Sequence, residues 1–342
     1  MPFNILNSVA KLPKNFGGVQ NLWVAVGDMI NIGKPFYSSP NGKNTWTQGT
    51  GSTSYNIYFS VAHGKGTWVA VTYNGNEIAY SMDGKAWQTT THASYYNGRG
   101  VAYGKDNTGA DLWVIAGAGG SSSLMLWSTN GIDWNSSGSI GGFNALDVAY
   151  GKDASGAGLW VAINDQAVKP IKYSSTGKGS WFDASVNTGI VSSIAYGKDA
   201  SGAGLWIAGA GNIMKSVDGK NWITITGVIN NVSKVAYGKD ASGAGLWVAV
   251  SEYDPFIAYS SNGNNWSATT STERNGCGAV FSVAYGKDGS GNGLWLINGN
   301  NAGYQKTFFH SVNGKNWTQF LSTDKPANLD KVRDIAFNNV DL

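Results

Sequence analysis

The chain has 342 residues and a formal net charge of +3, with 42% hydrophobic and 13% charged residues. This apolar content excludes a disordered polymer, and no run approaches the roughly 18 consecutive apolar residues that a membrane-spanning helix requires. The 21 lysines are scattered and there are only three arginines, which argues against a nucleic-acid-binding stripe.

The N-terminal segment and the cysteine content bear on the cellular setting. Residues 1–14 lack the basic start and the continuous apolar stretch of a secretory signal, so we expect a protein made in the cytoplasm and not inserted into a membrane. Cys277 is the single cysteine and cannot form an internal disulfide, so stability must come from packing.

One unit recurs along almost the whole chain. Each copy contains a phrase of the form Leu-Trp-Val-Ala and, further on, a second phrase that ends in Trp, so tryptophans occur in pairs. Five copies of the second phrase have the form Ser-x-Asp/Asn-Gly-x-x-Trp, and the copies near Asn41 and Thr176 carry insertions. The first tryptophans of successive pairs lie 41 to 48 residues apart, which is typical of repeat architectures. In chain order the pairs are Trp23/Trp46, Trp68/Trp87, Trp113/Trp134, Trp160/Trp181, Trp206/Trp222, Trp247/Trp266 and Trp295/Trp317. We therefore expect a single domain over residues 1–342 with seven repeats.

Each repeat reads as four short strands, called A to D here. Strand A is the Val-Ala-Tyr phrase (for example 148–150), strand B is Leu-Trp-Val-Ala-Val (246–250), strand C is Ile-Ala-Tyr-Ser (78–81), and strand D begins at the second tryptophan. Asn-Gly and Asp-Gly between C and D favour a tight hairpin. Strand B is apolar on both faces and needs cover on both sides, which sheets stacked around an axis provide. The sequence therefore predicts an all-β, seven-bladed β-propeller of four-stranded antiparallel blades.

Each end of the chain contains a candidate for strand A of the first blade. Residues 7–11 and 332–337 are both candidates, but Ile335-Ala336-Phe337 matches the repeat phrase better. We expect the C-terminal strand to join the first blade and close the ring. Residues 1–20 would then pack outside it.

The phrase between strands C and D resembles the Asp-box, or BNR, repeat of sialidase-like propellers, whose pattern is Ser-x-Asp-x-Gly-x-Thr-Trp. It is one residue shorter here, and asparagine replaces aspartate at Asn130, Asn262 and Asn313. The resemblance implies that the Asp or Asn side chain bonds turn amides and that the tryptophan fills the wedge between blades. Asp83 and Asp218 are accordingly interpreted as structural residues. The repeat rhythm also resembles, more loosely, propellers of phage and environmental bacteria, including virion and tail-fibre components.

The resemblance to sialidase-like propellers implies that ligands bind on the face built from the D-to-A and B-to-C connections. The D-to-A connections differ strongly between repeats, as expected where function varies. The candidate ligand-binding residues in these connections are Tyr55, Tyr58, Glu77, His92, Tyr95, Tyr96, Arg99, Asp165, Tyr253, Asp254 and Arg274. Tyrosine rings can stack on sugar C–H groups while Asp and Arg side chains bind hydroxyls, and the same composition is typical of protein-binding surfaces.

The case for an enzyme is incomplete. Arg99, Arg274 and Arg333 fall in or at the end of D-to-A connections, and sialidases clamp the substrate carboxylate with three arginines. The family's Phe-Arg-Ile-Pro opening motif is absent, and no Tyr/Glu nucleophile pair can be assigned. Another glycosidase would need two carboxylates about 5 to 10 Å apart. The possible donors are Glu77, Asp165 and Asp254.

Other reactive groups give no metal or nucleophile signal. His63 and His310 replace tyrosines of the repeat, which indicates packing, and the three histidines lack metal-ligand spacing. Cys277 has no basic motif beside it that would mark a thiolate nucleophile. The recurring Lys-Asp-Ala-Ser-Gly loop carries one carboxylate, too few for a calcium site. We expect neither a metal nor another cofactor.

These observations favour a non-enzymatic binding propeller with lectin-like glycan recognition or a role in surface attachment, as a virion or microbial surface component. Its partner would be a glycan or another protein on one face, and not a nucleic acid. The alternative is a structural assembly subunit, in a virion or another complex, that acts as a rigid docking platform. A sialidase-like glycoside hydrolase comes third.

Overall fold

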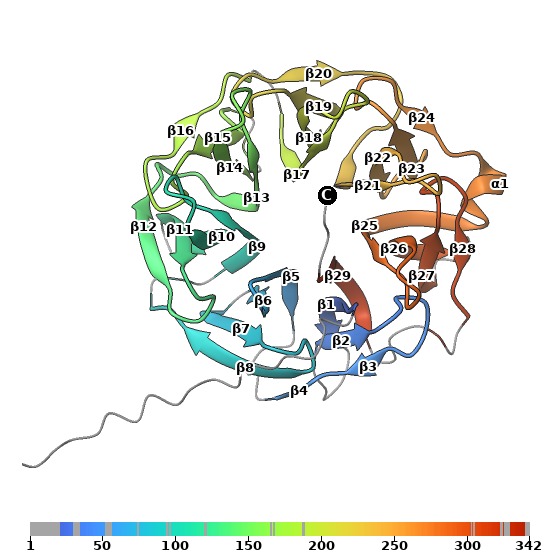
Figure 1. The fold of residues 1–342 in the computed structure, drawn as a ribbon, viewed down its shortest axis with the longest axis horizontal. Coiled ribbons are helices and arrows are strands. Elements are labelled where there is room, and N and C mark those ends of the chain that lie inside the picture. The colour runs from blue at the N-terminus through green and yellow to red at the C-terminus, as the bar shows by residue number, and fades with distance from the viewer. Residues whose placement is uncertain are drawn as a thin grey trace, which may run out of the picture.

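Four-stranded antiparallel sheets form around the tryptophan pairs and stand side by side around a central axis in the computed structural model (Figure 1). The structure describes residues 21–29, 35–51, 57–73, 75–93, 95, 97–119, 122–164, 166, 168–186, 189–301, 303, 305–321, 324 and 329–338. There are seven sheets, so the predicted seven-bladed β-propeller is confirmed. The expected position of residues 1–20 outside the ring concerns residues that lie outside those described.

The strands of the blades are as follows, each blade given from its inner strand outwards. The first blade is β29 (Leu329–Phe337), β1 (Trp23–Met29), β2 (Phe36–Ser39) and β3 (Thr47–Gln48), and the second is β5 (Tyr58–Gly64), β6 (Thr67–Thr72), β7 (Glu77–Ser81) and β8 (Ala86–Thr91), with β4 (Thr50–Gly51) added at its edge. The third is β9 (Asn97–Lys105), β10 (Asp111–Gly119), β11 (Ser122–Ser128) and β12 (Asn135–Ser139), and the fourth is β13 (Ala145–Lys152), β14 (Gly158–Asn164), β15 (Ile171–Ser174) and β16 (Phe182–Asp183).

The remaining blades follow the same order. The fifth is β17 (Val191–Lys198), β18 (Gly204–Ala210), β19 (Ile213–Ser216) and β20 (Ile223–Ile225), the sixth is β21 (Val232–Lys239), β22 (Gly245–Ser251), β23 (Ile257–Ser260) and β24 (Ser267–Ala268), and the seventh is β25 (Cys277–Lys287), β26 (Gly293–Asn301), β27 (Lys306–Ser311) and β28 (Thr318–Gln319). A single turn of helix, α1 (Ser271–Arg274), precedes the seventh blade. Within the described ranges no helix has the length and apolar character needed to cross a bilayer.

The ring is closed by the C-terminal strand, as predicted. β29 pairs antiparallel with β1, with Trp23 opposite Phe337 and Ala25 opposite Ile335. Phe337 takes the place that tyrosine has in other blades, because its ring centroid lies 5.0 Å from that of Trp23. The strands at the two ends of the described chain therefore share one sheet.

The recurring phrases are explained by contacts between neighbouring blades. The indole of Trp206 in the fifth blade donates to the backbone oxygen of Lys152 in the fourth at 2.8 Å. A Cβ atom added to Gly151 would lie 2.3 Å from the ring of Tyr196 in the next blade, so only glycine fits. Equivalent tryptophan bonds link four further pairs of neighbouring blades. The Tyr-Gly-Lys and Leu-Trp phrases are thus the two halves of one inter-blade joint.

The turns between strands C and D have the predicted hydrogen bonds. Asp83 Oδ1 accepts from the backbone amides of Lys85 and Ala86, both at 2.8 Å. Asn130 Oδ1 accepts in the same way at 2.9 Å, so asparagine can replace aspartate there. Burial raises the pKa of Asp218, but hydrogen bonds from Asn221 and Lys220 outweigh it and bring the value down to about 2.

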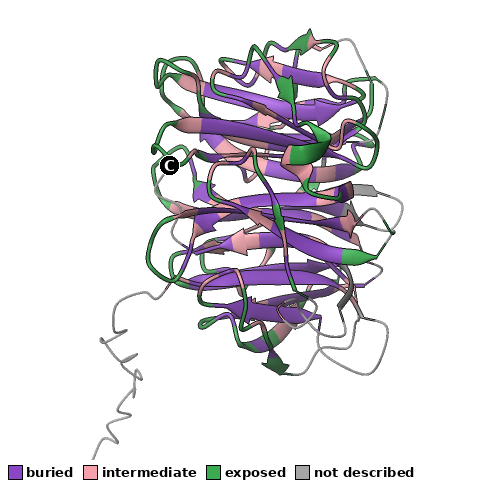
Figure 2. Cartoon of the chain, turned by 90° about the vertical axis from the view of Figure 1, so that its right-hand side faces the viewer, coloured by how far each residue is buried: buried purple, intermediate pink, exposed green. Residues whose placement is uncertain are grey.

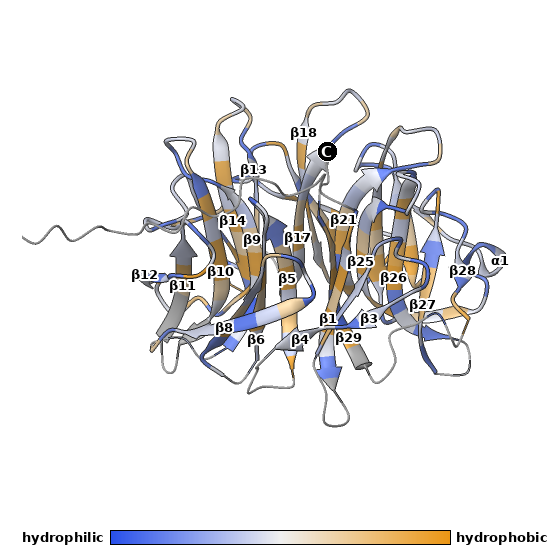
Figure 3. Cartoon of the chain, turned by 60° about the horizontal axis from the view of Figure 1, so that its bottom comes forward, coloured by the Kyte–Doolittle hydropathy of each residue, from blue (hydrophilic) through white to orange (hydrophobic). Residues whose placement is uncertain are grey.

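The core lies between blades. One cluster combines Leu159 and Ile163 of the fourth blade with Ile194 and Trp206 of the fifth. The strands are largely buried and the exposed residues gather in the connections (Figure 2). Hydrophobic residues likewise follow the strands through the middle of the disc, and hydrophilic ones gather toward its edges (Figure 3). Each blade therefore depends on its neighbours for its apolar cover.

Candidate functional site

The antiparallel order gives the disc two chemically different faces. We call the side with the A-to-B hairpins and C-to-D turns, such as 152–158 and 81–86, the hairpin face. The side with the D-to-A and B-to-C connections, such as 226–231 and 252–256, is the loop face. The loop face is the one that the sequence analysis singled out for ligands.

A pocket of about 950 Å³ opens on the loop face at the axis. All seven inner strands line it, with Phe59 of β5, Arg99 of β9, Phe281 of β25 and Arg333 of β29 among the lining residues. Glu252 and Tyr253, from a B-to-C connection, complete one side. We call this the axial pocket.

The inner strands carry one equivalent position just before the Val-Ala-Tyr phrase, and its side chains differ between blades. The residues at this position are Asp334, Ser60, Gly100, Asp147, Ser193, Lys234 and Ser282, from the first blade to the seventh. Four of these residues are small and three are charged. The repeat therefore brings three charges, separated by up to 187 residues in the chain, to one level of the axis.

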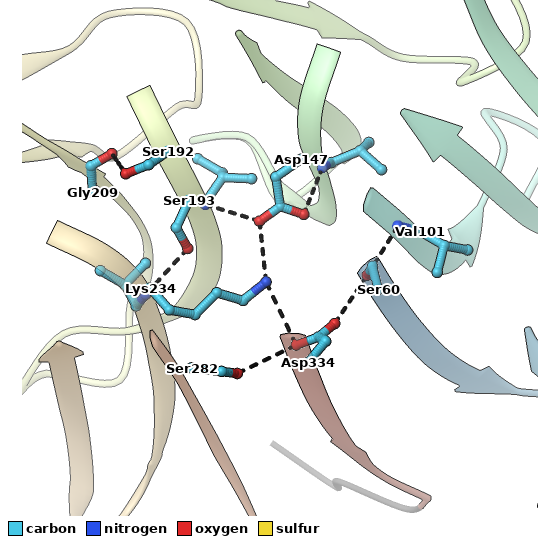
Figure 4. A network of polar contacts seen from close by, with 12 residues as sticks. Ser60, Val101, Asp147, Ser192, Ser193, Gly209, Lys234, Ser282 and Asp334 are labelled. Carbon is cyan, nitrogen blue, oxygen red and sulfur yellow. Dashed lines mark hydrogen bonds and ion pairs between the residues drawn. The ribbon is translucent and has the colours of Figure 1, made fainter. Parts of the chain in front are cut away.

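These three charged side chains point toward one another (Figure 4). Lys234 Nζ lies 3.4 Å from Asp147 Oδ2 and 3.8 Å from Asp334 Oδ1. Asp334 also accepts from the Ser60 hydroxyl at 2.9 Å and from the amide of Val61 at 3.2 Å. The axial cluster, as we call Asp147, Lys234 and Asp334, thus connects the fourth, sixth and first blades across the axis.

The environment of the axial cluster shifts the pKa values of Asp147 and Lys234. Burial raises the pKa of Asp147, and the charge of Lys234 offsets this only in part because Asp334 raises it further. Burial lowers the pKa of Lys234, but the two carboxylates outweigh burial, so the net shift is upward. Lys234 therefore stays protonated between its two partners.

Cations and an aromatic ring meet on another side of the pocket. The Arg99 guanidinium carbon lies 4.4 Å from the Tyr73 ring centroid and 5.1 Å from that of Phe59. Arg333 lies 4.5 Å from the same Phe59 ring and binds Asp28 through two hydrogen bonds of 2.8 and 2.6 Å. In the part of the chain that the structure describes, Arg99 has ring contacts but no ion pair.

Three of the predicted binding residues lie in the interior. Tyr58 and Tyr95 are 0% and 1% exposed, and Glu77 is 4% exposed. The Tyr58 hydroxyl donates to the Glu77 carboxylate, which pairs them within the second blade. Burial raises the pKa of Tyr95 well above its ordinary value. The rings of these two tyrosines therefore offer no face to a ligand.

The other predicted residues are divided between the pocket and more distant positions. Arg99 and Tyr253 line the axial pocket, and Tyr253 is 63% exposed. Arg274 does not line it; this side chain pairs with Asp254 at 2.5 Å beside α1. The three arginines therefore do not converge on one pocket. His92 follows β8, and partial burial lowers its pKa.

Tyr55, Tyr96 and Asp165 lie outside the described residues. The remaining reactive groups have packing roles. The His63 ring lies 4.8 Å from Trp68, and burial lowers its pKa to about 4. Burial also raises the pKa of the Cys277 thiol to about 12, although Arg274 lowers it slightly. Over the described ranges, no three His, Cys, Asp or Glu side chains gather in a way that could hold a metal ion.

Sequence reasoning missed Phe59, Asp147, Lys234 and Asp334 as parts of one site. The signal was present, because aligning the seven repeats puts charged residues at a position where the other blades have serine or glycine. In a propeller, equivalent positions of the inner strands face the same axis, so charges there can meet.

Comparisons with known proteins support the fold. Neither a protein-family model nor a curated protein matches the chain. Among solved structures, a functionally unknown protein from Desulfotomaculum acetoxidans has a TM-score of 0.64 at 10% identity, over 94% of this chain and 100% of that one. The GH74 enzyme of Niastella koreensis has a TM-score of 0.56 at 15% identity, over 84% of this chain. The GH74 xyloglucanase of Xanthomonas campestris has 0.57 at 14%, over 89%.

The chain spans only 41% of the Niastella koreensis enzyme and 56% of the Xanthomonas campestris xyloglucanase. At these identities the likeness shows a shared β-propeller fold alone.

Proposed function

We propose that this protein is a non-enzymatic binding propeller that recognises a carbohydrate in the axial pocket of the loop face. One observation carries the proposal: a pocket of about 950 Å³ combines aromatic rings with charged and hydrogen-bonding side chains. Apolar walls with a few well-placed polar groups are typical of small-ligand sites. On this proposal the glycan contact would serve attachment, as a component of a virion or microbial surface.

The pocket offers two kinds of contact that sugars need. Tyr253 is an exposed ring at the edge and can present a flat face to sugar C–H groups. The Phe59 ring already contacts the guanidinium groups of Arg99 and Arg333 and holds these two cations at the pocket. Arg99 can donate hydrogen bonds to sugar hydroxyls, and Glu252 can accept hydrogen bonds from them. Lys234 and its aspartates satisfy one another deeper in the pocket, which gives a fixed polar wall.

A glycoside hydrolase is the second candidate, because GH74 enzymes are among the structural neighbours and the pocket contains two carboxylates, Asp147 and Glu252. A raised pKa at Asp147 suits a general acid. Its oxygens, however, already accept from the amides of Val148 and Ile194. The resemblance of the C-to-D turns to sialidase-like repeats adds support for a sugar ligand. Docking of another protein would use the same residues at the mouth of the axial pocket.

A glycan array tests the proposal. The wild-type protein should bind a defined subset of glycans saturably, and a Tyr253→Ala/Arg99→Ala variant should bind them at least about tenfold more weakly. Phe182→Ala is the matched control, because Phe182 is an aromatic residue that is 55% exposed on outer strand β16.

The same glycans are then incubated with the protein and analysed for shorter products. If the wild type cleaves the glycans and Asp147→Asn does not, the protein is a glycoside hydrolase and the non-enzymatic proposal is wrong. Absence of any glycan binding would refute carbohydrate recognition and favour the docking platform.

A further inference from the structure

The hairpin face carries lysines at equivalent positions around the axis. Five inner strands end in a lysine, and a sixth, β5, is followed directly by one. These lysines are Lys65, Lys105, Lys152, Lys198, Lys239 and Lys287. Because the inner strands surround the axis (Figure 1), their ends surround it on the hairpin face. We call these six residues the lysine ring.

The fold fixes the backbone of this ring. The carbonyl oxygens of Lys152, Lys198 and Lys239 accept hydrogen bonds of 2.8 to 2.9 Å from tryptophan indoles of the next blade. The bonds use main-chain atoms and leave the ammonium groups unengaged. The ring therefore has a fixed backbone, and its side chains are exposed except that of Lys287, which is half-buried.

An aspartate follows five of the six ring lysines and could cancel their charge. Three of these aspartates, Asp106, Asp153 and Asp288, bind a lysine of a neighbouring blade, whereas Asp199 and Asp240 have no ion pair within the described ranges. Asp153 Oδ1 accepts from the amide and hydroxyl of Ser155 and from the amide of Ala157. Its other oxygen binds Lys220 of the next blade at 3.0 Å. The adjacent ring residue, Lys152, is left without this partner.

The same pattern occurs elsewhere on the face. Asp288 binds Lys43 at 3.2 Å, and Asp106 binds Lys178 at 2.6 Å, each across a blade boundary. Lys65 and Lys105 share the single carboxylate of Asp111. The four other ring members have no ion pair with any residue of the described ranges; they are Lys152, Lys198, Lys239 and Lys287. Counting the ring lysines, the aspartates beside them and their ion-pair partners, nine lysines lie beside six aspartates, so this part of the hairpin face has an excess of positive charge.

The face is also hollowed beside the ring. A cavity of about 670 Å³ lies between the hairpins of the sixth and seventh blades, with Lys43, Lys239, Lys287, Asp240, Asp288 and Tyr285 among its lining residues. Three lysines and two aspartates thus line one concave site; Lys43 is paired with Asp288, and Lys239 and Lys287 have no ion pair within the described ranges.

We propose that the lysine ring binds a linear phosphate-rich polyanion across the axis on the hairpin face. Lysine ammonium groups act as point charges that suit phosphate oxygens without demanding bidentate geometry. The three identical hairpins expose Lys, Asp, Ala, Ser and Gly but no aromatic side chain, so they cannot stack on bases as single-strand binders do. The lysines are scattered in the sequence, and the fold gathers them.

The test measures binding of fluorescently labelled inorganic polyphosphate at low salt. Wild type should bind, with an affinity that falls as salt rises. Lys152→Ala/Lys198→Ala/Lys239→Ala should bind at least about tenfold more weakly and with a smaller salt dependence. The control, Lys169→Ala/Lys215→Ala/Lys306→Ala, removes the same charge away from the ring and should stay within about threefold of wild type.

Circular dichroism establishes that each variant is folded. If the triple variant unfolds, the double variant Lys239→Gln/Lys287→Gln replaces it, because these side chains border the cavity and should still account for at least about a threefold loss.

Equal weakening in the ring and control variants would overturn the proposal in favour of a general charge effect. Failure of the wild type to bind polyphosphate would overturn it outright. Stronger binding to single-stranded DNA, or to vesicles of anionic lipid, at matched charge would assign the ring to a different partner. None of these outcomes depends on carbohydrate binding at the loop face.

Discussion

The two faces of the disc differ in how strongly neighbouring blades constrain their residues. On the hairpin face, Lys-Asp-Ala-Ser-Gly-Ala-Gly-Leu-Trp recurs identically from Lys152, Lys198 and Lys239. Several of its residues contact the adjacent blade: Asp153 binds Lys220, and Trp206 binds the Lys152 carbonyl. A change at one such position would disturb two blades, so the repeats are alike where they interlock.

The loop face has the opposite character. The position before the Val-Ala-Tyr phrase is Asp147 in one blade, Ser193 in the next and Lys234 in the one after. Side chains there meet at the axis instead of completing a repeated joint. The comparison indicates that repeat variation marks the candidate ligand site, whereas repeat identity marks assembly of the ring.

The largest effect should come from breaking the axial cluster. Lys234→Met leaves Asp147 and Asp334 facing each other with little solvent, and we expect a loss of about 3 to 5 kcal/mol in the free energy of unfolding. Urea denaturation measures it. Adding Asp147→Asn and Asp334→Asn to the same variant should recover part of the loss, because no unpaired charge remains. An unchanged midpoint for Lys234→Met would mean that the carboxylates do not depend on this lysine.

A glycine pair compares the two faces directly. Gly151→Ala places a Cβ atom 2.3 Å from the ring of Tyr196, whereas Gly211→Ala meets nothing within 4 Å. We expect Gly151→Ala to cost about 1 to 3 kcal/mol through overpacking between blades. Gly211→Ala should be neutral or stabilising by up to about 1 kcal/mol. Thermal denaturation of both variants checks this, and equal effects would contradict the distinction between the faces.

The sequence was sufficient for the fold because each repeat carries local and inter-blade signals together. The tryptophan pairs, the Asp-Gly turns and the two-sided apolar strand B all indicate one architecture. The match of Ile335-Ala336-Phe337 to the repeat even identified the closing strand, since Phe337 packs on Trp23 as a tyrosine would.

The candidate site was less predictable, for a physical reason. Tyr58 and Tyr95 looked like ligand-binding aromatics, but both rings are buried between neighbouring blades, and the sequence of a short connection does not reveal this burial. Asp147, Lys234 and Asp334 are far apart in the chain and meet only because the ring closes. The scattered lysines form a ring for the same reason.

The C-to-D turns should make a smaller contribution to the free energy of unfolding, and this contribution should depend on pH. Hydrogen bonds hold the pKa of Asp218 at about 2, below its ordinary 3.8. A lowered native pKa contributes stability that is present above the ordinary pKa and is lost as the pH falls toward the native value. Unfolding followed between about pH 5 and 2 should show this loss, and Asp218→Asn should reduce the slope while keeping the turn, as Asn130 does. If the stability of wild type and of Asp218→Asn falls with pH at the same slope, the lowered pKa of Asp218 would be contradicted.

The smallest effect on stability should come from the ion pairs at the edge of the hairpin face. Lys220 and Asp153 are 36% and 16% exposed, so Lys220→Ala should cost less than about 1 kcal/mol in the free energy of unfolding. The same change frees one Asp153 oxygen beside Lys152 and lowers the local positive charge. Lys220→Ala should therefore weaken polyphosphate binding although it changes the free energy of unfolding only slightly. Lys215→Ala should change neither quantity. A large loss of stability in Lys220→Ala would mean that the pair serves mainly to join the fourth and fifth blades, with its effect on the lysine ring secondary.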